Sequence, residues 1–235
     1  MKQIDQTCFS AFLNYFYRNY SHFNNEEAYS DLIWNITMNL CIINRKYKKI
    51  TKDNTLLINE LLSRSNQLIN NIFSQNTTAK SKFYRSIYYL NAEKFNNIYL
   101  SSFNLKFIDS FKPFYQMNYE RVTTDSLLQQ NFETILKQMN IEYIKEFKTD
   151  YCVVDFLVDK NNIFEINGPQ HYVGFSSEMK AQDVLKGRTL KINGFNVKNI
   201  SYKDILVPDF VTKIIMNTVK KEETNVNSNN IKFKV

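Results

Sequence analysis

Glycine is confined to one short stretch of this 235-residue chain. The sequence contains 4 glycines, and all of them lie between residues 168 and 194. Glycine reaches positive φ angles at little cost, so its absence elsewhere argues against a fold with many tight turns, such as a turn-rich β-sandwich. We expect helices in the N-terminal half and special backbone geometry between residues 168 and 194.

The N-terminal half, residues 1–120, repeats apolar side chains at helical spacing. Helices are expected in three ranges: 28–43, 55–73 and 81–103. Residues 9–20 are interpreted as a packed helix face rather than as a cleaved targeting signal. The half carries 14 basic and 9 acidic residues, a net charge of +5. We predict a basic, all-α domain that is either a scaffold for a polyanion or a packing domain with solvated lysines. Its aromatic residues at 83–115 are expected in a core rather than in a base-stacking platform.

Composition excludes several classes of protein. Hydrophobic residues make up 43% of the chain and aromatic residues 15%, which argues against a disordered protein. The cysteines, Cys8, Cys41 and Cys152, are odd in number and far apart, so neither a disulfide framework nor a zinc knuckle is expected. Only 2 histidines are present, which argues against histidine-based metal sites. No apolar run approaches the roughly 18 residues that a membrane span needs.

The second half, residues 121–223, alternates helical and strand patterns. A helix that begins after Thr123, Thr124 and Asp125 is followed by three strands, a helix, a strand and a helix. The expected ranges after the first helix are 141–147, 151–158, 163–166, 177–192, 195–201 and 208–221. The helix between the third and fourth strands forces a crossover, so we predict an α/β domain with a mixed sheet. Residues 224–235 are expected to be a disordered tail.

Two carboxylates stand out in the expected hairpin. Asp155 is a charge inside an apolar strand, and pairing across the hairpin turn places it near Ile166, one position from Glu165. Carboxylates on adjacent strands can bind Mg²⁺ through oxygen ligands. They can equally form ion pairs with Lys186 and Arg188 of the following helix. The residues alone leave both interpretations open.

Three segments of this half follow one another: IFEINGPQHY at 163–172, LKGRTL at 185–190 and GFNV at 194–197. Together with the VDF strand at 154–156, they resemble the RAP domain family, whose name abbreviates an RNA-binding domain abundant in apicomplexans. The family commonly has Asp where this chain has Asn167. It also has Pro-Tyr and an acid followed by Trp where this chain has Ser-Tyr-Lys-Asp at 201–204.

The resemblance implies a restriction-endonuclease-like fold, whose active members place an Asp and an acid-x-Lys pair around Mg²⁺. Asp155 and Glu165 match the two acids, but Asn167 occupies the lysine position, and an amide cannot supply the positive charge. If the protein is a Mg²⁺-dependent endonuclease, Lys186 replaces that lysine and His171 assists as acid or base. Metal-dependent cleavage is therefore the alternative function.

The resemblance favours RNA binding without cleavage, with the RAP-like domain on phosphates and no cofactor required. The expected partners are RNA, including rRNA and a ribosomal particle, and no membrane. We expect a role in organellar RNA or rRNA processing, stabilisation or ribosome assembly. Mitochondria are the expected location, and the cytoplasm of an AT-rich bacterium is the alternative. The expected RNA contacts are Asn167, Gln170, His171, Lys186, Arg188 and Lys191.

Overall fold

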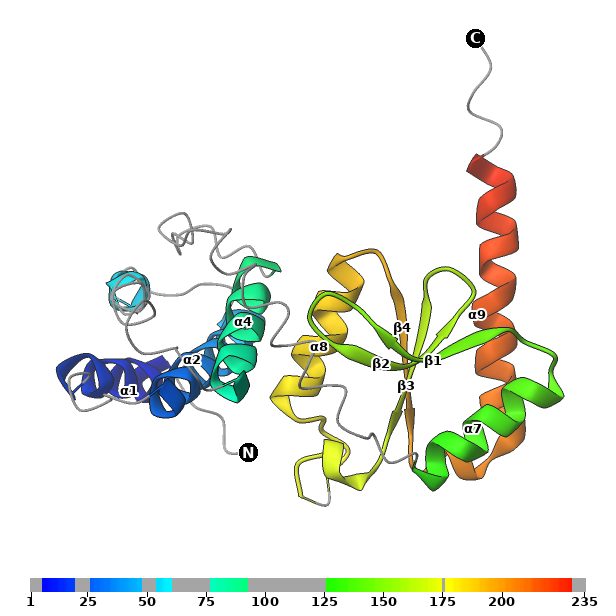
Figure 1. Ribbon diagram of the computed structural model, residues 1–235, viewed down its shortest axis with the longest axis horizontal. Coiled ribbons are helices and arrows are strands. Elements are labelled where there is room, and N and C mark those ends of the chain that lie inside the picture. Colours follow the sequence, from blue (N-terminus) through cyan, green and yellow to red (C-terminus); the bar gives the residue numbers. More distant parts are fainter. Residues whose placement is uncertain are drawn as a thin grey trace, which may run out of the picture. The chain divides into compact units, whose positions relative to one another are not determined.

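The computed structural model describes most of the chain (Figure 1). The described residues are 6–19, 26–47, 54–60, 77–92, 126–174 and 176–229. The chain divides into two compact units. Unit 1 comprises Met1–Thr123 and Ala181–Thr189, and unit 2 comprises Thr124–Lys180 and Leu190–Val235.

The described residues before position 93 are all helical, which confirms the expected all-α character of this part of the chain. Three of the helices are α1 (Gln6–Asn19), α2 (Glu26–Tyr47) and α4 (Thr77–Ala92), and residues 54–60 are helical as well. The expected helix at 28–43 lies within α2. The parts of the other two expected helices at 61–73 and 93–103 lie outside the described residues.

Aromatic side chains build the core of the described helices in unit 1. Tyr29 of α2 and Phe83, Tyr84 and Tyr89 of α4 are buried. The ring of Trp34 lies 6.0 Å from the ring of Tyr89. The prediction that aromatic residues here form a core is therefore confirmed for the described part of 83–115.

Basic side chains on α4 also take part in packing. The Arg85 guanidinium lies 5.0 Å from the centroid of the Trp34 ring. Lys82 forms an ion pair with Asp31 of α2, and Lys80 is buried. These cations therefore contribute contacts to the fold of the helices.

Unit 2 follows the expected order of elements and contains a mixed sheet (Figure 1). Its elements are α7 (Leu127–Gln138), β1 (Tyr143–Lys148), β2 (Val153–Val158), β3 (Asn162–Asn167), the 3₁₀ turn η3 (Pro169–His171), β4 (Asn196–Ser201), η4 (Asp204–Leu206) and α9 (Pro208–Asn229). The helix α8 (Ala181–Ile192) connects β3 to β4 and spans the division between the units. Strand order is β1-β2-β3-β4; β3 and β4 are parallel, and the other two pairs are antiparallel. The predicted α/β arrangement is confirmed.

The core of unit 2 lies between one face of the sheet and the helices α7 and α9 (Figure 1). The ring of Phe132 on α7 lies 5.1 Å from that of Phe156 and 5.4 Å from that of Phe164. Val211 and Ile215 bring α9 into the same cluster. None of the helices in the described ranges is both long and apolar enough to cross a bilayer.

The start of α7 differs from the sequence prediction. The N-cap is Ser126, whose side chain accepts a hydrogen bond from the Gln129 N–H, while the Gln129 side chain accepts one from the Ser126 N–H. This reciprocal capping box satisfies two free N–H groups at once, so it sets the start of the helix. The residues first expected as caps, 123–125, lie outside the described residues.

The bounds of α8 and α9 also differ. α8 begins at Ala181 rather than at 177, because Met179 forms an isolated bridge with Tyr172 and the Lys180 N–H donates to the His171 carbonyl oxygen at 2.8 Å. Those backbone groups are therefore used outside the helix. α9 continues to Asn229, so the residues expected as a tail are helical from 224 to 229.

Candidate nucleic-acid interface

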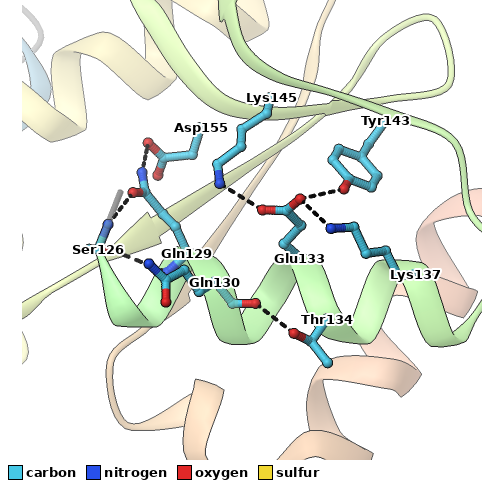
Figure 2. Close-up of polar contacts among 9 residues, drawn as sticks. All are labelled: Ser126, Gln129, Gln130, Glu133, Thr134, Lys137, Tyr143, Lys145 and Asp155. Carbon is cyan, nitrogen blue, oxygen red and sulfur yellow. Dashed lines mark hydrogen bonds and ion pairs between the residues drawn. The ribbon is translucent and has the colours of Figure 1, made fainter. Parts of the chain in front are cut away.

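The carboxylate of Asp155 on β2 accepts two hydrogen bonds, one of them from Gln129 in the first turn of α7 (Figure 2). Its Oδ1 accepts from the side-chain amide of Gln129 at 2.9 Å. Its Oδ2 accepts from the backbone N–H of Ile166 on β3 at 2.6 Å. The capping box of α7 is thereby linked through Gln129 to the middle of the sheet.

The ladder of backbone pairs changes at Asp155. In the β1–β2 ladder, Lys145 pairs with Phe156 and Phe147 pairs with Val154, but Glu146 and Asp155 between them are not paired. Glu146 has a positive φ of 51°. The β2–β3 register ends at Phe156↔Phe164. Beyond that pair, the Ile166 N–H donates a hydrogen bond to the Asp155 carboxylate. Asp155 therefore does lie near Ile166, as predicted, and it supplies an acceptor in place of a backbone carbonyl.

The two carboxylates proposed as magnesium ligands lie in different surroundings. Glu165 is buried, with 8% of its surface exposed, and Asp155 uses both oxygens to hold Gln129 and Ile166. Within the described ranges, no three His, Cys, Asp or Glu side chains are grouped closely enough to hold a metal ion. Mg²⁺ can be held by one or two carboxylates with water completing its coordination, so the nuclease alternative stays a prediction.

Asn167, in the expected lysine position, is buried and serves the sheet. Its side-chain amide donates to the Asn199 side-chain oxygen at 3.1 Å and to the Glu165 carbonyl oxygen at 3.3 Å. Its own carbonyl oxygen accepts from the Tyr202 N–H at 2.8 Å. Asn167 thus links the end of β3 to the end of β4 through its side chain and its backbone.

The chain turns away from the sheet directly after Asn167. A Cβ at Gly168 would lie 2.4 Å from the side-chain oxygen of Gln170, so glycine allows the two residues to approach closely. The His171 N–H donates to the Gly168 carbonyl oxygen at 3.1 Å, closing the 3₁₀ turn. Gln170 is exposed and His171 is half-buried. The special geometry predicted from glycine also holds at Gly174 and Gly194, where φ is 56° and 91°.

Because β3 and β4 are parallel, the segments that follow them lie at the same edge of the sheet. We call residues 168–174, 176–180 and 202–203 the carboxyl edge. The ring of Tyr172 meets the ring of Tyr202 edge to face, with centroids 5.9 Å apart. Lys180 and Lys203 are exposed. The carboxyl edge thus combines positive charge, an amide, an imidazole and two phenol rings.

The other three predicted contact residues belong to α8. Lys186 and Arg188 are half-buried and belong to the part of α8 that is grouped with unit 1. Lys191 is exposed near the C-terminal end of α8, where its carbonyl oxygen accepts from the Gly194 N–H before β4 begins. A strand of six residues spans roughly 17–20 Å, so Lys191 lies at the opposite end of β4 from the carboxyl edge.

A second polar group, which we call the Glu133 cluster, joins α7 to β1 (Figure 2). Glu133 accepts from Lys137 at 2.7 Å, from Lys145 at 2.6 Å and from the Tyr143 hydroxyl at 2.7 Å. The hydrogen bond from Lys137, followed by those from Lys145 and Tyr143, lowers the pKa of Glu133 to about 2. Burial, and then the hydrogen bond to Glu133, raise the pKa of Tyr143. These charges are compensated within unit 2.

Tyr202, Lys203 and Lys180 of the carboxyl edge were not among the contact residues predicted from the sequence. Their signal is weak, since each is an ordinary polar or aromatic residue beside the recognised segments. The capping box was not predicted either, although Ser followed three residues later by Gln is a known helix-start pattern. The spacing of Glu133 and Lys137 was likewise a visible signal for an ion pair on one helix face.

The fold and the carboxyl edge define unit 2 as a small α/β domain with a polar, cationic rim at the end of two parallel strands. Residues 164–210 match the RAP domain family, which confirms the resemblance stated above. A RAP domain indicates RNA binding in general terms. The match covers β3, η3, α8, β4 and the start of α9 and therefore contains the whole carboxyl edge. A comparison with curated proteins found no matching relative.

Proposed function

We propose that this protein binds RNA through the carboxyl edge of unit 2 and acts in organellar RNA or rRNA processing, stabilisation or ribosome assembly. The observation that carries the proposal is that the segment matching a RAP domain places exposed Lys180, Lys203 and Gln170 at the same edge of the sheet as half-buried His171. Amine and amide donors in this arrangement suit phosphate oxygens.

The backbone around these side chains favours binding with little rearrangement. Asn167 links β3 to β4, and the His171 carbonyl oxygen fixes the backbone of Lys180. The backbone that carries these donors is already fixed, so it loses little conformational freedom when a ligand binds. Mitochondria are the proposed location, and a ribosomal particle is a proposed partner.

The test is a filter-binding titration against RNA at several salt concentrations. Saturable binding is expected, with log K falling against log salt by about 0.7 for each phosphate contact. Lys180→Gln should reduce that slope, whereas Lys160→Gln, which removes an exposed lysine at the β2–β3 turn, is the matched control and should leave it unchanged. Absence of saturable binding at low salt would overturn the proposal.

Two further measurements address the finer parts of the proposal. Imaging of a C-terminally tagged copy tests the mitochondrial location, and co-sedimentation with ribosomal particles at moderate salt tests the ribosomal partner. Incubation of labelled RNA with wild type and Glu165→Ala, each in Mg²⁺ and in EDTA, tests binding against cleavage. We expect intact RNA in all four reactions; cleavage that requires both Mg²⁺ and Glu165 would instead establish the nuclease.

A further inference from the structure

The carboxyl edge contains a pair of tyrosine rings that phosphate contacts do not use. Tyr172 follows η3 and Tyr202 follows β4, and their ring planes meet at 66° with centroids 5.9 Å apart. Both residues are half-buried, so each keeps part of its surface open to solvent. The pair therefore combines a defined position with access from outside.

Main-chain hydrogen bonds anchor both tyrosines. The Tyr202 N–H donates to the Asn167 carbonyl oxygen at 2.8 Å, which extends the pairing of β3 and β4 by one step. The Tyr172 N–H donates to the Pro169 carbonyl oxygen at 3.1 Å, and Tyr172 also forms a bridge with Met179. Because the backbone fixes where each ring lies, placing a base against either ring costs less conformational freedom.

Positive charge lies directly beside these rings. The ammonium nitrogen of Lys203 lies 5.6 Å from the centroid of the Tyr202 ring. Lys203 is exposed, so its flexible side chain can leave the ring and meet a phosphate at little cost. Lys180 directly follows Met179, the bridge partner of Tyr172. A nucleotide whose base reaches the rings therefore has a cation available for its phosphate.

We infer that the carboxyl edge binds single-stranded RNA by stacking unpaired bases on Tyr172 and Tyr202, with Lys203 and Lys180 on the flanking phosphates. The inference rests on the proposed function, since it names the form of RNA that the same site takes. In a duplex the faces of the bases are covered by their neighbours, whereas a single strand can turn them toward aromatic side chains. Any base can stack on an aromatic ring, so the site distinguishes single-stranded from double-stranded RNA more strongly than it distinguishes sequences.

The experiment measures affinity for a single-stranded RNA and for the same strand in a duplex. Wild type should bind the single strand more tightly. Tyr202→Leu should weaken single-strand binding about tenfold, because it removes one stacking partner, and should leave the salt slope unchanged. Tyr202→Phe is the matched control and should bind as wild type does, since the ring is retained. A 2-aminopurine base in the strand should lose fluorescence on binding to wild type.

The outcomes separate this inference from the proposed function. If wild type binds no RNA, both fail. If wild type binds RNA but prefers the duplex, or if folded Tyr202→Leu binds as tightly as wild type, only the stacking inference fails. Thermal unfolding checks that Tyr202→Leu is folded. If Tyr202→Leu is not folded, the fluorescence of 2-aminopurine in RNA bound to wild type and to Tyr202→Phe tests the stacking instead. Fluorescence that stays unchanged on binding, at every 2-aminopurine position along the strand, would overturn the inference.

Discussion

The Glu133 cluster and the carboxyl edge are both polar parts of unit 2, yet their charges face different surroundings. Glu133 accepts hydrogen bonds from Lys137, Lys145 and Tyr143, all of them within the protein. Lys180 and Lys203 are exposed at the end of two parallel strands.

This difference separates stabilising polar groups from binding ones. A charge compensated within the fold favours the folded state and has little remaining capacity for a ligand. An exposed lysine contributes little to folding, so its charge remains available to a phosphate. We therefore expect substitutions at the Glu133 cluster and at Asp155 to change the free energy of unfolding. Substitutions at the carboxyl edge should change RNA affinity instead.

The largest expected effect on stability is that of Asp155→Ala. It removes the acceptor for both the Ile166 N–H and the Gln129 amide, and we expect the free energy of unfolding to fall by about 3 kcal/mol. Urea unfolding followed by circular dichroism measures this change. Asp155→Asn keeps one carbonyl acceptor and should lose about half as much. An unchanged midpoint for Asp155→Ala would show that the link between α7 and β3 contributes nothing.

Glu133→Gln should lower the free energy of unfolding by about 1–2 kcal/mol, because the amide has no charge for Lys137 and Lys145. RNA affinity of the folded variant should match that of wild type. A large loss of RNA affinity without loss of stability would contradict the distinction between the two regions.

The pH dependence of stability sharpens the same prediction. The pKa of Glu133 is about 2 in the folded protein and 4.5 as the reference value, so the unfolded chain takes up the proton first as pH falls. The contribution of Glu133 is therefore present above pH 4.5 and is lost as pH falls from 4.5 toward 2. Glu133→Gln lacks this part of the pH dependence, so its stability should approach that of wild type in acid. If the free energy of unfolding changes with pH in the same way for wild type and Glu133→Gln, the lowered pKa of Glu133 is contradicted.

Asn167→Asp tests the connection between the sheet and the carboxyl edge. An ionised Asp cannot donate to the Asn199 side chain or to the Glu165 carbonyl oxygen, so we expect a loss of about 1 kcal/mol at neutral pH. Asn199→Asp keeps the acceptor that Asn167 uses and serves as the matched control. Thermal unfolding compares the two variants. Equal midpoints would mean that the direction of this hydrogen bond does not matter.

The smallest expected effect on stability is that of Lys203→Gln, whose side chain is exposed. Its free energy of unfolding should remain within about 0.5 kcal/mol of wild type. Its RNA binding, in contrast, should lose about 0.7 from the slope of log K against log salt. The same titration with Lys160→Gln controls for net charge. A stability loss larger than that of Asn167→Asp would place Lys203 with the stabilising groups.

Much of unit 2 could be predicted from local patterns. Runs of apolar, β-branched and aromatic residues identified β2 and β3, and helical spacing identified α7 and α9. The stretch predicted to have special backbone geometry includes Gly194, where φ is 91°. The exact ends could not be predicted in the same way. α8 starts late because the backbone of Met179 and Lys180 pairs with the segment around His171, which is a contact between turns rather than a local preference.

The candidate site was predictable only in part. The segment from Glu165 to His171 was identified from its residues, but Asn167 proved to be a buried link within the sheet. Lys191 was grouped with the same site, although the direction of β4 separates it from the carboxyl edge. The sequence places Lys191 at the end of a helix, but only the direction of β4 in the sheet shows which end of the strand Lys191 lies at.

The sequence alone determined the kinds of elements, their order and the parallel crossover, because hydrophobic periodicity and turn residues act over a few positions. It also determined the resemblance to the RAP domain, since that resemblance depends on residue identity. Only the tertiary structure decided the roles of individual side chains. Gln129 meets Asp155 across 26 positions, and Tyr172 meets Tyr202 only because β3 and β4 end at the same edge of the sheet. Such contacts depend on the register and direction of strands, which the packing of the whole unit sets.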